Sequence, residues 1–274
     1  MKLEIISRRS EHPSSKPPLL FVHGAYVGAW CWEEFFLDWF AARGYDAHAV
    51  SLRGHGASAG REQLNDFGLA DYAADVARAA AELPGPPVLV GHSMGALVVQ
   101  KFLERAPGTP AMVLACPVPS YGLLPSSFAL AFSRPELFAG LNTVASGGHA
   151  SPEVLAKALF AGPVERALLE RCYRRTQRES RRALLEMTGW GLPFLWNPWG
   201  AGANRPPTLV LGSGKDSLIP SPQARSTASQ LRADYRELPA LGHALMLDDG
   251  WEQAAGAISG WLDERTFAIP EVGA

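Results

Sequence analysis

One short stretch, from Val88 to Gly95, limits most strongly what this chain can fold into. An apolar run, Val88-Leu89-Val90, leads into Gly91-His92-Ser93-Met94-Gly95, and a second apolar run opens what we expect to be a helix. The pattern G-x-S-x-G between a strand and a helix predicts a sharp turn, which needs glycine on both sides of the serine. Such a turn lifts the serine hydroxyl clear of the sheet and directs the N–H of Met94 toward a developing oxyanion. The alternative is a glycine-rich connection with a solvent-facing serine.

Composition favours a globular enzyme without a highly charged partner. The chain has 274 residues, of which 47% are hydrophobic and 19% charged, enough for a sizeable core. A formal net charge of -2 gives no reason to expect nucleic acid or an anionic membrane as a partner. The three cysteines, Cys31, Cys116 and Cys172, fit neither a disulfide framework nor a zinc site. We expect them to be buried in a reducing compartment.

The N-terminal segment gives no targeting signal. Residues 1–8 alternate in polarity and carry charge, so we expect no signal peptide. No uninterrupted apolar stretch reaches a membrane-spanning length. The expected location is therefore the cytoplasm.

Strand and helix patterns alternate along most of the chain. Short apolar runs predict strands, and longer periodic segments between them predict helices. The expected strands are residues 3–6, 19–22, 47–52, 88–90, 111–116, 208–211 and 234–239. The expected helices include residues 30–42, 67–83 and one ending near residue 104. This order predicts an α/β fold with a mostly parallel sheet.

The alternation stops between residues 120 and 204, where only helical patterns and Pro/Gly breaks occur. Because long bare loops are uncommon inside compact domains, we expect a helical cap there. The expected division is a core α/β domain in two parts, 1–119 and 205–274, with the cap at 120–204. An arginine-rich part, residues 164–187, is interpreted as a solvated helix face with i,i+4 ion pairs, or as a basic face for an anionic substrate.

Aromatic side chains of the expected cap are candidates for a substrate pocket. A cap above the carboxyl end of the sheet must cover the site there, so apolar residues on it are expected to touch the substrate. The candidate substrate-binding residues are Tyr26, Phe128, Phe132, Phe138, Trp190 and Trp196.

Two further polar residues follow predicted strands. Asp216 lies in the loop after residues 208–211, and His243 comes shortly after the last strand. With Ser93 they occur in the chain order Ser, Asp, His, each just beyond a strand. The carboxyl ends of parallel strands share one edge of a sheet, so residues distant in sequence can meet there. A lone Asp or His in a loop is usually solvated, but a Ser, an Asp and a His that each follow a strand in this order predict a catalytic site.

These motifs resemble those of the α/β-hydrolase fold over almost the whole chain. The resemblance rests on His23-Gly24, Arg53-Gly54-His55-Gly56-Ala57-Ser58, Gly91-His92-Ser93-Met94-Gly95, Gly212-Ser213-Gly214-Lys215-Asp216 and Gly242-His243. It implies that Ser93 is the nucleophile, His243 the general base and then acid, and Asp216 the group that orients the imidazole. It also implies an oxyanion hole from the backbone N–H groups of Ala25 and Met94. His23, His55 and His92 would then be structural.

Residues 22–32 also resemble the subgroup of small methyl esterases and hydroxynitrile lyases. The lyases carry a lysine directly after the catalytic histidine, where this chain has Ala244, which argues against lyase chemistry. Serine at position 93 excludes the aspartate nucleophile of dehalogenases and epoxide hydrolases of this fold.

The expected activity is hydrolysis of a small to medium apolar carboxylic ester through an acyl-enzyme. Lactone, thioester and carbon–carbon bond hydrolysis stay open with the same three residues, as does a non-catalytic receptor on this fold. We expect no metal and no organic cofactor, and a small-molecule ester as the partner. The oligomeric state is not determined by the sequence.

Overall fold

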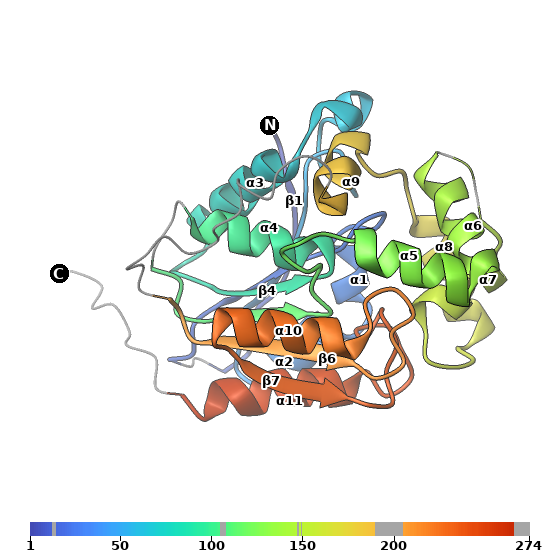
Figure 1. The fold of residues 1–274 in the computed structure, drawn as a ribbon. Helices are drawn as coiled ribbons and strands as arrows, with labels where there is room; N and C mark the ends of the chain where they lie inside the picture. Colours follow the sequence, from blue (N-terminus) through green and yellow to red (C-terminus); the bar gives the residue numbers. More distant parts are fainter. Residues whose placement is uncertain (13–14, 105–107, 147, 149, 190–204, 266–274) are drawn as a thin grey trace.

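The computed structural model describes residues 1–12, 15–104, 108–146, 148, 150–189 and 205–265. They form a seven-stranded sheet with the strand order β1-β3-β2-β4-β5-β6-β7 (Figure 1). Strands β2 to β7 are parallel, and only β1 pairs antiparallel, with β3. The strands are β1 Glu4–Arg8, β2 Leu19–Val22, β3 Ala47–Ser51, β4 Val88–His92, β5 Met112–Ala115, β6 Thr208–Ser213 and β7 Asp234–Leu238. The predicted α/β fold with a mostly parallel sheet is confirmed.

Helices cover both faces of this sheet. One face is covered by α1 Trp30–Glu33, α2 Phe36–Ala41 and α11 Glu252–Asp263, and the other by α3 Leu69–Ala81, α4 Met94–Leu103 and α10 Ser221–Leu231. Alternate residues of β2 enter the two cores, Leu19 and Phe21 on one side and Leu20 and Val22 on the other. A strand buried on both faces must be apolar throughout, which is why this run could be identified from the sequence.

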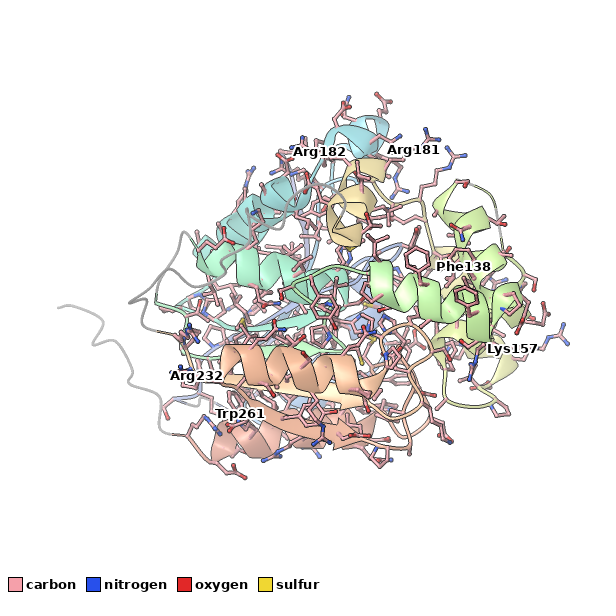
Figure 2. All side chains as sticks on the ribbon, viewed as in Figure 1. Phe138, Lys157, Arg181, Arg182, Arg232 and Trp261 are labelled. Atoms are coloured by element: carbon pink, nitrogen blue, oxygen red, sulfur yellow. The ribbon has the colours of Figure 1, made fainter. Side chains whose placement is uncertain are left out.

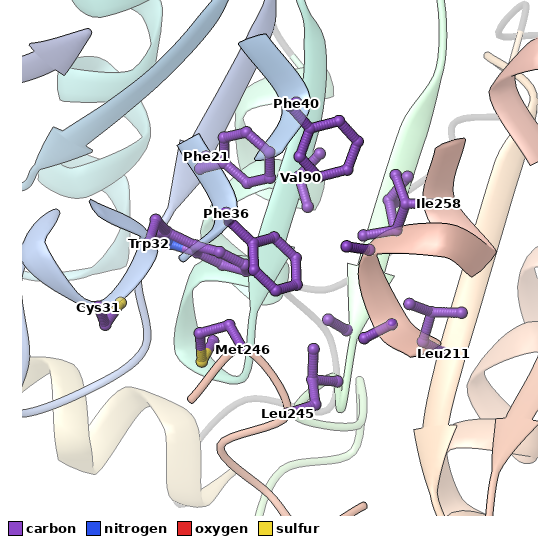
Figure 3. Close-up of a cluster of buried hydrophobic side chains, with 14 of the residues drawn as sticks. Phe21, Cys31, Trp32, Phe36, Phe40, Val90, Leu211, Leu245, Met246 and Ile258 are labelled. Carbon is purple, nitrogen blue, oxygen red and sulfur yellow. The ribbon is translucent and has the colours of Figure 1, made fainter. Parts of the chain in front are cut away.

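The core between the sheet and helices α1, α2 and α11 is rich in aromatic rings (Figure 3). The ring of Phe21 on β2 lies 4.9 Å from that of Trp32 and 5.5 Å from that of Phe40, centroid to centroid. Each large ring buries much apolar surface and stabilises the fold by about 1.5–3 kcal/mol relative to an exposed side chain. These contacts fix β2, whose carboxyl end leads into the candidate site.

The single helix predicted over residues 30–42 is wrong in one respect: the structure divides it into α1 and α2. Phe35 between them has a non-helical φ of -139°. Its ring stacks on Trp251 with the centroids 5.1 Å apart and the planes 5° from parallel. This long-range contact, which helical periodicity does not reveal, accounts for the break. A short 3-10 helix, η1 Arg61–Asp66, was also not predicted.

In the segment expected to be a cap, the described residues form five helices joined by irregular links, with no strand among them. Its helices are α5 Leu124–Ser133, α6 Pro135–Ala145, α7 Pro152–Leu159, α8 Arg166–Arg175 and α9 Arg181–Thr188. Figure 1 shows α5 to α8 gathered beyond one end of the sheet and α9 beside α3 and α4. We call the described residues 120–189 the insertion. No helix among the described residues is long and apolar enough to cross a membrane.

The arginine-rich residues 164–187 were expected to form one solvated helix face, but they fold into two separate helices, α8 and α9. The expected i,i+4 pairs are present at Arg166–Glu170 and Arg182–Glu186. Arg175 instead pairs with Glu33, the last residue of α1, and Arg171 pairs with Glu34 directly after it. Glu179 is buried. Arg171, Arg175 and Glu179 therefore hold the insertion to the rest of the fold.

Candidate active site

Ser93 lies on the sharp turn that the glycine spacing predicts, between β4 and α4. Its backbone has φ 53° and ψ -116°, a conformation that costs energy for a residue with a side chain. The flanking glycines are required by contact. A Cβ on Gly91 would lie 2.5 Å from the carbonyl oxygen of Gly95, and one on Gly95 would lie 2.5 Å from the carbonyl oxygen of His23. The turn therefore holds the serine at the carboxyl end of the central strand.

His243 and Asp216 meet at the same end of the sheet. The imidazole Nδ1 of His243 lies 2.8 Å from Oδ2 of Asp216, and both side chains are buried. The other carboxylate oxygen, Oδ1, accepts the backbone N–H groups of Leu218 and Ile219, each at 2.8 Å. Because the aspartate is held on both sides, it fixes the orientation of the imidazole ring. His243 and Ser93 both line the same cavity.

The other three histidines of the motifs make structural contacts. His92 Nε2 lies 2.9 Å from the carbonyl oxygen of His243, so the ring donates there and holds the backbone of that residue. Burial and the neighbouring His243 lower the pKa of His92 well below 6.5, so this ring is neutral. His23 accepts the N–H of Leu52 at 3.0 Å, and burial lowers its pKa to about 3. His55 pairs with Glu179 of the insertion at 2.9 Å.

The loop after β2 passes directly beside Ser93. A Cβ on Gly24 would lie 3.2 Å from the Cβ of Ser93 and 2.9 Å from Nδ1 of His92, so only glycine allows this approach. Gly24, Ala25 and Tyr26 all line the cavity. Met94 is the first residue of α4, where backbone N–H groups point out of the helix. The two predicted oxyanion donors therefore lie on segments that flank the serine.

Above these residues lies a cavity of about 690 Å³ between the sheet end and the insertion. This volume is in the range of typical small-molecule sites. Its walls are mainly apolar, and none of the described lining residues is Asp or Glu. The insertion contributes residues from α5 to α9, among them Leu130, Phe138, Leu155, Leu159, Tyr173 and Met187.

The structure supports only part of the predicted aromatic pocket. Tyr26 and Phe138 line the cavity, and Figure 2 locates Phe138 among the helices of the insertion. Phe128 and Phe132 do not: they are 63% and 88% exposed, because α5 turns this side to solvent while Leu130 faces inward. Trp190 and Trp196 lie outside the described residues.

Cys116 lies beside Asp216 and His243, although the sequence did not indicate it as a site residue. It follows β5 with a positive φ of 44° and donates its thiol to Ser213 at 3.3 Å. Potential ligand atoms of Cys116, Asp216 and His243 lie within 4.8 Å of one another. Burial and the charge of Asp216 raise the pKa of the thiol well above 9.0, so it is protonated. Asp216 and His243 hydrogen-bond to each other and Cys116 to the hydroxyl of Ser213, so the three side chains form a hydrogen-bonded cluster.

A mostly parallel sheet that presents Ser93, Asp216 and His243 at one end defines the α/β-hydrolase class of folds. Comparison with known proteins agrees. The chain belongs to the Alpha/beta hydrolase family, whose sequence profile matches residues 19–257.

Its relatives include a probable esterase (PIR7A) of Oryza sativa subsp. indica, 33% identical over 187 residues, which span 65% of this chain and 68% of the relative. A monoacylglycerol lipase of Mycolicibacterium smegmatis is 29% identical over 237 residues, 81% of this chain and 80% of the relative. An esterase structure from Exiguobacterium antarcticum superposes with a TM-score of 0.70 over 95% of both chains at 15% identity, which supports the fold alone.

Proposed function

We propose that the protein hydrolyses carboxylic esters with Ser93 as nucleophile. The observation that carries this proposal is the Asp216–His243 pair, 2.8 Å apart, beside a serine on a strained turn at the floor of an apolar cavity. The esterase and lipase relatives point to the same reaction class.

In the proposed reaction, His243 takes the proton of Ser93 as the hydroxyl attacks the ester carbonyl. Asp216 holds the imidazole with its proton on Nδ1, which leaves Nε2 free to accept. The N–H groups of Ala25 and Met94 would stabilise the oxyanion. His243 then returns the proton to the leaving alcohol, and water activated by the same ring hydrolyses the acyl-enzyme.

The volume and the mainly apolar lining of the cavity support a small to medium apolar substrate. Residues 120–204 act as a cap in this proposal, and its described helices supply a large part of the apolar wall. Because no carboxylate is found among the described lining residues, a neutral acyl chain is accommodated without desolvating an acid.

A substrate panel tests the proposal. We expect turnover of p-nitrophenyl esters, with kcat/KM rising with acyl length until the cavity is filled, and no turnover by Ser93→Ala. Lactones and thioesters are measured in the same series. Turnover by Ser93→Ala equal to that of the parent protein would refute the assignment, and folded protein that turns over no ester would support a receptor role instead.

A further inference from the structure

The extended link between α8 and α9 brings a carboxylate into the interior. Glu179 is only 4% exposed, and glutamate is rarely so buried unless it is paired. Its oxygens face four donors. Oε1 accepts from the hydroxyl of Tyr72 at 2.8 Å and the N–H of Ser180 at 2.7 Å, and Oε2 accepts from His55 Nε2 at 2.9 Å and the N–H of Tyr26 at 3.2 Å.

The partner of this carboxylate is an imidazolium. His55 Nδ1 lies 3.0 Å from the carbonyl oxygen of Arg53, and Nε2 faces the carboxylate of Glu179. Both nitrogens thus face acceptors, so both must carry a proton. Burial alone would lower the pKa of His55, but the charge of Glu179 raises it above 6.5. The same pairing, against the effect of burial, lowers the pKa of Glu179. Glu179 is therefore ionised inside the protein.

One of the four donors belongs to the loop beside Ser93. Tyr26 has a φ of 68°, in the left-handed region that is uncommon for any residue other than glycine. Such a conformation persists only where the surroundings fix it. Here the N–H of Tyr26 donates to Glu179, and its carbonyl oxygen accepts the N–H of Gln177 at 2.9 Å. Both contacts come from the link between α8 and α9.

We propose that Glu179 is a positioning residue that holds the backbone of Tyr26 and thereby aims the N–H of Ala25 at the oxyanion. The N–H of Ala25 lies in the Gly24–Ala25 peptide plane, and the next plane carries the Tyr26 N–H that donates to Glu179. The two planes meet at the Cα of Ala25, and Gly24 packs directly against Ser93. Fixing the second plane limits rotation about the Cα of Ala25, so loss of the Glu179 contact lets the Ala25 N–H turn away. The inference rests on the proposed function, because it assigns the Ala25 N–H to the oxyanion hole.

The test variant is Glu179→Gln. Tyr72 and His55 can accept as well as donate, but the backbone N–H groups of Ser180 and Tyr26 can only donate, and they face different oxygens of Glu179. An amide in either orientation therefore turns its NH2 toward one of these two N–H groups, and it also lacks the charge that pairs with His55. We expect kcat to fall about tenfold to a hundredfold, since complete removal of one oxyanion donor costs about 10²–10³. KM should change little, because the cavity wall is retained. The affinity for an alkyl trifluoromethyl ketone, whose adduct with Ser93 carries an oxyanion, should fall in parallel with kcat, whereas the affinity for the matching methyl ketone should not.

Two control variants separate this role from stability. Glu170→Gln removes an exposed carboxylate from the same insertion, and we expect wild-type kcat. Tyr72→Phe removes one donor but leaves the contact with Tyr26, so it should lower Tm while reducing kcat less than Glu179→Gln does. If Glu179→Gln does not fold, Glu179→Asp takes its place, because it shortens the reach to Tyr26 by one methylene, and the same losses are expected.

The outcomes of these experiments distinguish an error in the proposed function from an error in the role assigned to Glu179. Ester turnover by Ser93→Ala would refute the proposed function itself. If turnover depends on Ser93, but the Glu179 variant keeps the kcat and trifluoromethyl ketone affinity of Glu170→Gln and loses only Tm, the positioning role is wrong. A parallel loss of kcat and of trifluoromethyl ketone affinity at nearly constant KM supports it.

Discussion

The substitution Asp216→Asn tests the geometry of the site most sharply, because the structure determines which way the new amide must point. In the native protein Oδ1 accepts two backbone N–H groups, from Leu218 and Ile219, each at 2.8 Å. Reversing the amide would place its NH2 against both donors and forfeit two hydrogen bonds of about 1 kcal/mol each. The asparagine therefore keeps its oxygen there and turns its NH2 toward Nδ1 of His243.

An NH2 facing Nδ1 makes that nitrogen an acceptor, so the ring proton moves to Nε2. That tautomer cannot take the proton of Ser93. We expect kcat to fall about 10⁴-fold, as it does when the acid of such a triad becomes an amide. This loss corresponds to about 5.4 kcal/mol of activation free energy.

The assay is kcat on a p-nitrophenyl ester at neutral pH, with urea unfolding to verify that the variant is folded. The matched control is Asp249→Asn, which removes an exposed carboxylate in the loop after His243 and should keep wild-type kcat. A folded Asp216→Asn variant that keeps more than about a tenth of wild-type kcat would show that this aspartate does not set the tautomer of His243.

Three further substitutions or conditions have expected outcomes. Gly91→Ala should destabilise the protein by about 1–3 kcal/mol in urea unfolding, because its Cβ would overlap the backbone of α4, whereas Gly85→Ala, with open space around it, should not. Phe138→Ala should lower kcat/KM about tenfold for the longest esters that bind, while Phe132→Ala on the solvent side should leave the chain-length profile unchanged; equal effects would contradict the assigned cavity wall. The Tm advantage of the wild type over Glu179→Gln should be largest between pH 4.5 and 6.5. Burial opposes both charges, but pairing lowers the pKa of Glu179 below 4.5 and raises the pKa of His55 above 6.5. The stabilisation is therefore lost as pH falls through the pKa of folded Glu179, or as pH rises through the pKa of folded His55. A Tm difference independent of pH would contradict an ionised pair.

Much of the fold follows from local patterns in the sequence. Residues 19–22 and 88–90 are buried on both faces of the sheet, so their continuous apolar runs identify them as strands. Asp216 follows the buried strand β6 and His243 comes shortly after the edge strand β7, and because both strands are parallel to β4, the loops that follow them lie at the same edge of the sheet as Ser93. The glycines on either side of Ser93 occur where the backbone packs so closely that a Cβ would overlap neighbouring atoms.

Features set by long-range contacts could not be predicted in this way. The break at Phe35 depends on stacking with Trp251, more than two hundred residues later in the chain. Phe128 and Phe132 share a helix with Leu130, and composition alone did not indicate which side of α5 faces the cavity. Glu179 lies between an arginine and a serine in a charged segment, so nothing local distinguishes it from the solvated acids nearby. Its burial follows only from where α8 and α9 place the link between them.

The most direct test of the central claim is to locate the covalent adduct formed by a fluorophosphonate. The account predicts one adduct per chain, found by peptide mass spectrometry on Ser93, with labelling and ester turnover lost together in Ser93→Ala. Labelling of a different residue, or ester turnover that continues in the Ser93→Ala variant, would contradict the claim that Ser93 is the nucleophile.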